Sequence, residues 1–251
     1  MNPDLYPDLA SAGSLAAALE SAAAELAVDI TLAPGRWGDA ASAGIAAPVG
    51  TVPSGPASRG RRGPLHVSLS TGERCFGVSG WSLGTEMITG WTADLRDVVR
   101  AAVAWGSGLS LAELRERFPF LTSSELAEAH EHGVAAVVGL QWSWIRERAL
   151  QEPEFTGFGL LVAAADAEPR LRQLSPVVSH RTLVLRDRTG FPSDPVIAIA
   201  PAQDGCPYRV QRFPHGGVIA EVGTAEEAVA LAVAHLPAGL GPAVLGSKED
   251  G

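Results

Sequence analysis

Residues 80–105, GWSLGTEMITGWTADLRDVVRAAVAW, contain the clearest change from strand to helix in the chain. We predict Thr92 as the N-cap of the helix, because its hydroxyl can accept from the free N–H groups of the first turn. Asp94 then places negative charge at the positive end of the helix dipole. Apolar residues follow at helical spacing until Gly106, namely Leu95, Val98, Val99 and Ala102.

A similar pattern occurs near the other end of the chain, in residues 216–236, GGVIAEVGTAEEAVALAVAHL. Thr224 and Glu227 there have the spacing of a capping box, and Pro237 stops the helix. Short strands with Gly-containing turns precede this helix, which favours antiparallel pairing. The sequence therefore predicts an α+β protein with two mixed halves, each having antiparallel strands and a capped helix.

An all-helical segment is predicted between the two halves. Ser110 and Glu113 form a capping box for a helix over 111–117, and Thr122 and Glu125 begin another helix with a break at Gly133. The predicted domains are a mixed N-terminal half (1–106), a helical segment (107–150) and a C-terminal α+β half (151–251). Within the first half, residues 34–63 are mostly Gly, Pro, Ala and Ser, which predicts a flexible loop.

Composition excludes several classes of function. The formal net charge of -9 argues against nucleic-acid binding, which requires clustered positive charge. The one basic cluster, Arg59, Arg61 and Arg62, lies in the Gly- and Pro-rich stretch, and we interpret it as a solvated linker. Lys248 is the only lysine, which disfavours Schiff-base chemistry and excludes a P-loop. We therefore expect no cofactor.

The chain has two cysteines, Cys75 and Cys206, and neither has the spacing of a metal ligand. No apolar stretch approaches the roughly 20 residues that span a bilayer, and the N-terminus lacks the pattern of a signal peptide. From these features we expect a cytoplasmic protein without a membrane partner.

Six stretches carry a resemblance to a known family: GWSLG (80–84), the helix after GWTADL (90–95), LAELRERFPFL (111–121), ELAEAHEHG (125–133), AEPRLRQLSPVVSHRTL (167–183) and TAEEAVALAVAHLP (224–237). In this order they resemble the actinobacterial family called domain of unknown function 6193, over nearly the whole chain. Members of that family are often labelled natural product biosynthesis proteins. The resemblance implies a setting in bacterial secondary metabolism, and it implies no reaction, cofactor or catalytic residue.

Two weak signals suggest an enzyme. Residues 80–84 match G-x-S-x-G, with Ser82 as the possible nucleophile. Acids and histidines follow in the order of an α/β-hydrolase: Asp187, Asp194, then His215 or His235. Because a strand pattern follows Ser82, a hairpin turn is the favoured interpretation. His180, at the start of a predicted strand, is our first choice of general base, with Asp187 to orient it. The alternative for His180 is a solvated strand terminus.

Residues 128–132 contain the acids and histidines of a possible metal site: Glu128, His130, Glu131 and His132. Histidines two apart on a helix point to different sides, so a solvated helix end is the favoured interpretation and we expect no metal.

Trp142 and Trp144 are also two apart, so one of them can remain on the surface, where Trp is typical of binding sites. We expect an accessory or interaction protein of secondary metabolism. It would bind a pathway enzyme, a carrier or a peptide intermediate near Trp142 or Trp144. The alternative is a cofactor-independent enzyme using His180 with an acid or Ser82. A third class, an immunity protein, fits only the acidic charge.

Overall fold

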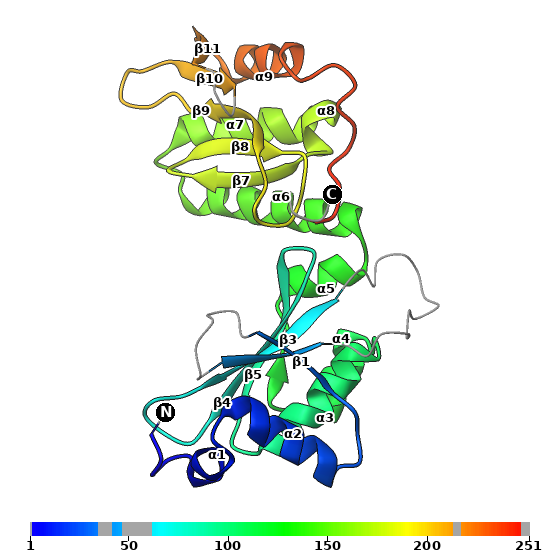
Figure 1. The fold of residues 1–251 in the computed structure, drawn as a ribbon. Helices are drawn as coiled ribbons and strands as arrows, with labels where there is room; N and C mark the ends of the chain where they lie inside the picture. The colour runs from blue at the N-terminus through cyan, green and yellow to red at the C-terminus, as the bar shows by residue number, and fades with distance from the viewer. Residues whose placement is uncertain (1, 35–41, 47–61, 213–216, 247–251) are drawn as a thin grey trace. The chain divides into compact units, whose positions relative to one another are not determined.

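The structure is a computed structural model that describes residues 2–34, 42–46, 62–212 and 217–246 (Figure 1). The chain divides into two compact units, Met1–Glu131 and His132–Gly251. Each unit has its own antiparallel sheet and its own hydrophobic core. The predicted α+β class is therefore confirmed. Among the described residues, no helix has both the length and the apolar character needed to cross a bilayer.

The first unit contains a six-stranded antiparallel sheet within its described residues, with the strands in chain order. The strands are β1 (Thr31–Pro34), β2 (Ser42–Ala46), β3 (Arg62–Leu69), β4 (Phe76–Ser82), β5 (Thr85–Thr92) and β6 (Leu121–Thr122). Its helices are α1 (Pro7–Ala12), α2 (Leu15–Glu25), α3 (Leu95–Gly106), α4 (Leu111–Arg117) and α5 (Glu125–Glu131). Sequential strands that pair with their neighbours form a simple meander.

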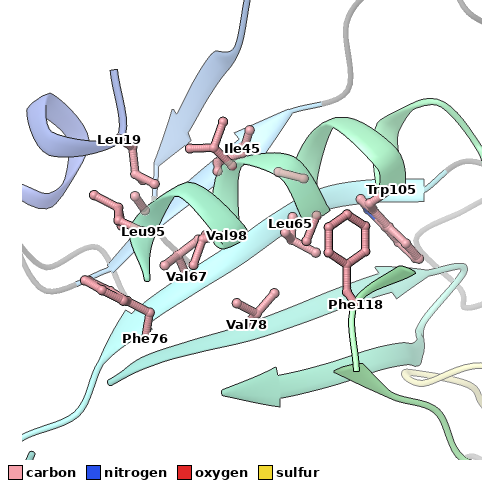
Figure 2. Close-up of a cluster of buried hydrophobic side chains, with 14 of the residues drawn as sticks. Leu19, Ile45, Leu65, Val67, Phe76, Val78, Leu95, Val98, Trp105 and Phe118 are labelled. Atoms are coloured by element: carbon pink, nitrogen blue, oxygen red, sulfur yellow. The ribbon is translucent and has the colours of Figure 1, made fainter. Parts of the chain in front are cut away.

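Helix α3 packs on one face of this sheet and defines the first core. Figure 2 shows Leu95, Val98 and Trp105 of α3 directed toward side chains of the sheet. The sheet contributes alternate residues, including Leu65 and Val67 of β3, which are buried. This period of two is what an antiparallel sheet with one covered face requires. The opposite face of the same strands is consequently available for other side chains.

The start of α3 differs from the prediction. Thr92 is the last residue of β5 and pairs with Phe76, so the strand extends further than expected. The N-cap is Asp94, whose carboxylate accepts from the N–H of Arg96 at 2.8 Å. The Thr92 hydroxyl instead accepts from the N–H of Asp94. The predicted Thr92 cap was wrong because strand pairing holds that residue in the sheet.

The Gly80–Gly84 motif forms a hairpin turn between β4 and β5, as predicted. Ser82 and Thr85 pair across the turn, and the two residues between them have positive φ: 47° at Leu83 and 73° at Gly84. Positive φ at both central positions defines a type I′ turn, whose twist matches that of the flanking strands. Glycine adopts this conformation without strain, which explains Gly84.

The loop predicted over 34–63 is contradicted where the structure describes it. Strand β2 lies inside that stretch, and Ala43 and Ile45 enter the core. The linker interpretation of Arg62 is also wrong, because its side chain is only 9% exposed and its guanidinium lies over the Trp105 ring. Residues 35–41 and 47–61, including Trp37, Arg59 and Arg61, lie outside the described residues.

The helices after α3 follow the prediction in part. The capping box of Ser110 and Glu113 is present, and it begins α4 where expected. Thr122, predicted as a cap, is in β6, where its hydroxyl donates to the carbonyl of Thr89. The next helix, α5, begins at Glu125, and Gly133 with a φ of 98° separates it from α6. The predicted cap was wrong, and the predicted break was confirmed.

The second unit contains a five-stranded antiparallel sheet in the order β11-β10-β9-β8-β7, counted over its described residues. The strands are β7 (Ser175–Ser179), β8 (Thr182–Arg186), β9 (Pro195–Ala200), β10 (Tyr208–Arg212) and β11 (Val218–Val222). The helices are α6 (Val134–Gln151), α7 (Thr156–Ala167), α8 (Pro169–Arg172) and α9 (Ala225–Ala234). Helix α6 packs on β7, α7 packs between α6 and α9, and α9 packs on β9 to β11.

The second unit follows the predictions in part. The capping box of Thr224 and Glu227 begins α9 as predicted. The segment between α6 and β7 forms two helices, α7 and α8, because Glu168 is extended and Pro169 begins α8. Strand β7 was not predicted, since Ser175-Pro176 resembles a loop. The helical segment predicted over 107–150 contributes α4 and α5 to the first unit and α6 to the second.

Candidate ligand-binding site

The face of the first sheet that points away from α3 carries a small trough. Strand β3 places Leu65 and Val67 in the core, so His66 and Ser68 point to the other side. The same alternation along β4 and β5 exposes a row of polar and aromatic residues. The trough has a volume of about 240 Å³ and is lined by Ser42, His66, Val67, Ser68, Gly77, Val78, Ser79, Trp81, Glu86, Thr89, Gly90 and Trp91.

Strand register brings these side chains together. The facing pairs are Ser42–Ser68, Ser68–Gly77, Gly77–Trp91, His66–Ser79, Ser79–Thr89 and Trp81–Glu86. Directly opposed side chains have Cβ atoms about 5 Å apart. Residues from four strands, separated by up to about fifty positions in the sequence, therefore form one continuous surface.

Trp91 forms one end of the trough. A Cβ atom added to Gly77 would lie 2.8 Å and 2.9 Å from atoms of the Trp91 ring, so the indole lies directly over this glycine. Trp91 is nevertheless 58% exposed. The glycine thus allows the large ring to lie close to the sheet while leaving part of its surface available for contact with a ligand.

Trp81 and Glu86 form the other end. They face each other across β4 and β5, and Glu86 is exposed. Within the described part of the chain, the Glu86 carboxylate makes no hydrogen bond or ion pair. Trp81 follows Gly77 by four residues on β4, which corresponds to about 13 Å along a strand. The two indoles are thus anchored at opposite ends of a short trough.

Small hydroxyl side chains line the space between the tryptophans. Ser68 and Ser79 are half-buried and Thr89 is exposed. The hydroxyl of Ser42 is buried and has no hydrogen-bond partner among the described residues. Because a buried polar group without a partner costs free energy, such a group is a natural contact point for a bound molecule.

The charge of the trough restricts its ligand. Among the described residues that line it, Glu86 is the only carboxylate and none is an Arg or Lys. Phosphate and carboxylate groups are usually bound by arginine, lysine or helix N-termini. The lining therefore suits a neutral or cationic ligand with a flat or apolar group to place on an indole.

The residues predicted for catalysis do not line this trough. Ser82 ends β4, is 4% exposed and belongs to the first unit, whereas His180 and Asp187 belong to the second. His180 is exposed in the two-residue turn between β7 and β8, with a φ of 48° and its Nδ1 3.3 Å from the hydroxyl of Ser179. Asp187 follows the far end of β8, so a strand of about 20 Å separates it from His180.

The other acids and histidines of the hydrolase order are equally dispersed. His235 follows α9, and its Nδ1 lies 2.9 Å from the carbonyl of Leu231. Asp194 precedes β9, and His215 lies outside the described residues.

The two tryptophans predicted to bind a partner differ in burial. Trp142 is 1% exposed in the core of the second unit, which is the inward position expected for one of the pair. Trp144 is 39% exposed. The prediction of a partner surface on α6 therefore concerns Trp144, because a buried indole cannot contact a partner.

The acids and histidines at the end of α5 have other roles. Glu128 forms an ion pair with Arg115, and Glu131 accepts from the N–H of Leu111. His130 is 1% exposed, and neither of its ring nitrogens has a hydrogen-bond partner among the described residues. This burial lowers the pKa of His130. In the part of the chain that the structure describes, no group of three or more potential metal ligands occurs.

The sequence contained a signal for the trough that motif analysis missed. Polar residues alternate with apolar ones along β3, and the pattern continues through Ser79 and Trp81 on β4. Such alternation predicts which side chains leave the core. It does not predict which strands are neighbours, and therefore the tryptophans on β4 and β5 could not be placed in one site.

The molecule is thus an α+β protein with two antiparallel sheets, one of which carries a ligand-sized trough. The sequence profile of a family of unknown function, DUF6193, matches residues 136–247. The predicted resemblance to this family is confirmed over that segment, which contains the phrases at 167–183 and 224–237. The trough lies outside the matched residues. No curated protein and no solved structure matches the chain.

Proposed function

We propose that this protein is a binding protein that holds a small organic ligand in the trough of its first sheet. The observation that carries the proposal is the combination of two indoles, at the two ends of the trough, with hydroxyl groups between them. Apolar and aromatic surfaces with a few polar groups are the usual composition of small-ligand sites. The hydroxyl of Ser42, which has no hydrogen-bond partner among the described residues, supports it further.

An accessory role in secondary metabolism is the setting that we propose for this binding. It rests on the resemblance to DUF6193, whose matched segment begins at residue 136. In this proposal the first unit holds a pathway intermediate. The second unit provides the surface for a pathway enzyme or carrier, with exposed Trp144 as one of its contact residues.

A catalytic role is the second candidate, because His66 and Ser79 are directly opposed in the trough. A histidine beside a serine is the core of many nucleophilic sites, but the base is normally oriented by a third group. The only carboxylate in the lining, Glu86, is on β5, two strands from His66 and hence about 10 Å away across the sheet. This separation favours binding over catalysis.

The proposal can be tested by screening a library of soluble fragments with NMR, using the indole N–H signals of the full chain. We expect fragments that shift the signals of Trp81 and Trp91 and leave that of buried Trp142 unchanged. These fragments should lose affinity at least about tenfold for Trp91→Ala, because the exposed indole supplies much of the contact area. The matched control is Trp144→Ala, which removes an exposed indole of the second unit.

The outcomes separate the candidates. Fragments that shift neither Trp81 nor Trp91, or that bind Trp91→Ala as well as the parent protein, would contradict the binding proposal. Chemical conversion of a bound fragment, lost in His66→Gln and Ser79→Ala, would instead establish the catalytic alternative.

A further inference from the structure

We infer that the trough is selective for small organic cations, such as a substituted amine or a quaternary ammonium group. This inference rests on the proposed function and adds the chemical class of the ligand. Three features of the described lining residues lead to it: the exposed indole of Trp91, one carboxylate without a partner among the described residues, and no arginine or lysine in the described lining.

The indoles provide the first feature. The face of an aromatic ring is electrostatically negative, and Trp attracts cations more strongly than Tyr or Phe. The Trp91 ring lies over Gly77 and is 58% exposed. At another tryptophan of this unit, a cation of the protein itself makes such a contact: the guanidinium of Arg62 lies 4.1 Å from the centroid of the Trp105 ring. A ligand can occupy the corresponding position over Trp91.

Glu86 provides the second feature. Its carboxylate faces Trp81 across the strand pair and has no hydrogen bond or ion pair within the described residues. Two other carboxylates of this unit do form ion pairs: Glu131 lies 3.5 Å from Arg62, and Asp8 lies 2.7 Å from Arg74. A cation over Trp91 would also be attracted by the negative charge of Glu86 in the same trough.

The third feature is that none of the described lining residues carries a positive charge, and the chain as a whole is acidic. Because the chain has a net charge of -9, its long-range field concentrates cations and repels anions. The volume also fits a small ligand. At about 240 Å³ the trough has room for about eight groups of the size of a water molecule.

The test compares choline with 3,3-dimethylbutan-1-ol, the neutral alcohol in which carbon replaces the charged nitrogen. Isothermal titration of the full chain should show choline binding about tenfold more tightly than the alcohol. Glu86→Gln should remove most of this difference and leave the affinity for the alcohol unchanged. The control, Glu116→Gln, removes the same charge from an exposed helical position of the same unit and should not alter the difference.

Equal affinity for the two compounds, or unchanged selectivity in Glu86→Gln, would overturn the inference and leave the proposed binding function intact. Failure of choline to bind at millimolar concentration would overturn it as well. The proposed function itself is decided by the fragment screen: it fails if the Trp81 and Trp91 signals respond to no compound, or if the fragments bind Trp91→Ala as well as the parent protein. Near-ultraviolet circular dichroism of each variant checks that the environment of the indoles is retained.

Discussion

Replacement of Arg62 by methionine is expected to destabilise the first unit strongly. The Arg62 side chain is 9% exposed and connects the start of β3 with the segment after α3. Nη1 donates to the carbonyl of Trp105 at 3.0 Å, and Nη2 donates to that of Leu109 at 2.6 Å. Nη2 also lies 3.5 Å from Glu131. The guanidinium therefore satisfies one carbonyl of the last turn of α3 and one carbonyl of the loop that follows, and a positive charge is favourable at this end of a helix.

The magnitude follows from these contacts. Hydrogen bonds to a charged group contribute about 1.5–3 kcal/mol each, and removal of one partner from a buried ion pair costs about 3–5 kcal/mol. Glu131 is 19% exposed and keeps the N–H of Leu111 as a donor, which lowers its share of the loss. Methionine retains the apolar contact with Trp105. We therefore expect a loss of about 3–4 kcal/mol, a large fraction of the stability of a typical domain.

Urea unfolding of the full chain, followed by tryptophan fluorescence and by hydrogen exchange of peptides from the first unit, measures this loss. The matched control is Arg96→Met. Arg96 also pairs with a carboxylate, Glu25, but the two side chains are 54% and 58% exposed, so we expect a loss below about 1 kcal/mol. A loss for Arg62→Met as small as that of the control would refute the anchoring role.

Three further predictions concern other parts of the chain. Thr224→Ala removes a capping box and should destabilise the second unit by about 1 kcal/mol in urea unfolding, whereas an unchanged midpoint would exclude the cap. Burial lowers the pKa of His130, so the unfolded chain binds a proton that the folded chain does not. Stability should therefore fall as pH decreases below about 6.5, and pH-dependent unfolding of His130→Leu should lack this component. Gly90→Ala should cost about 3 kcal/mol, because a Cβ there overlaps the carbonyl of Phe120, while Gly139→Ala, with open space around it, should be neutral or stabilising by thermal unfolding.

The fold was predictable wherever neighbouring residues decide it. The capping boxes at Ser110 and Thr224 and the turn after Ser82 all formed as expected. The prediction failed where a residue pairs with a strand partner that is distant in the sequence. Thr92 is a good N-cap by composition, but its pairing with Phe76 keeps it in β5 and moves the cap to Asp94.

The candidate site was less predictable than the fold. The sequence motifs pointed to Ser82, His180 and Asp187. Ser82 belongs to the first unit, whereas His180 and Asp187 belong to the second unit and lie at opposite ends of β8. The trough residues have no motif, since a serine or a tryptophan on a strand is unremarkable until its neighbours are known. Alternation along β3 identifies His66 as facing away from the core, but the strand beside it is not specified by that pattern.

The sequence by itself determined the α+β class, the acidic charge and the local ends of several helices, because each depends on composition or on residues within about four positions. Only the tertiary structure decided the role of Arg62 and the content of the trough. Arg62 contacts residues 43 to 69 positions away, and the trough exists because four strands pair in one register. A shift of one residue in any of these strands would turn its trough side chains into the core, so the site is a property of register and cannot be found in a short stretch of sequence.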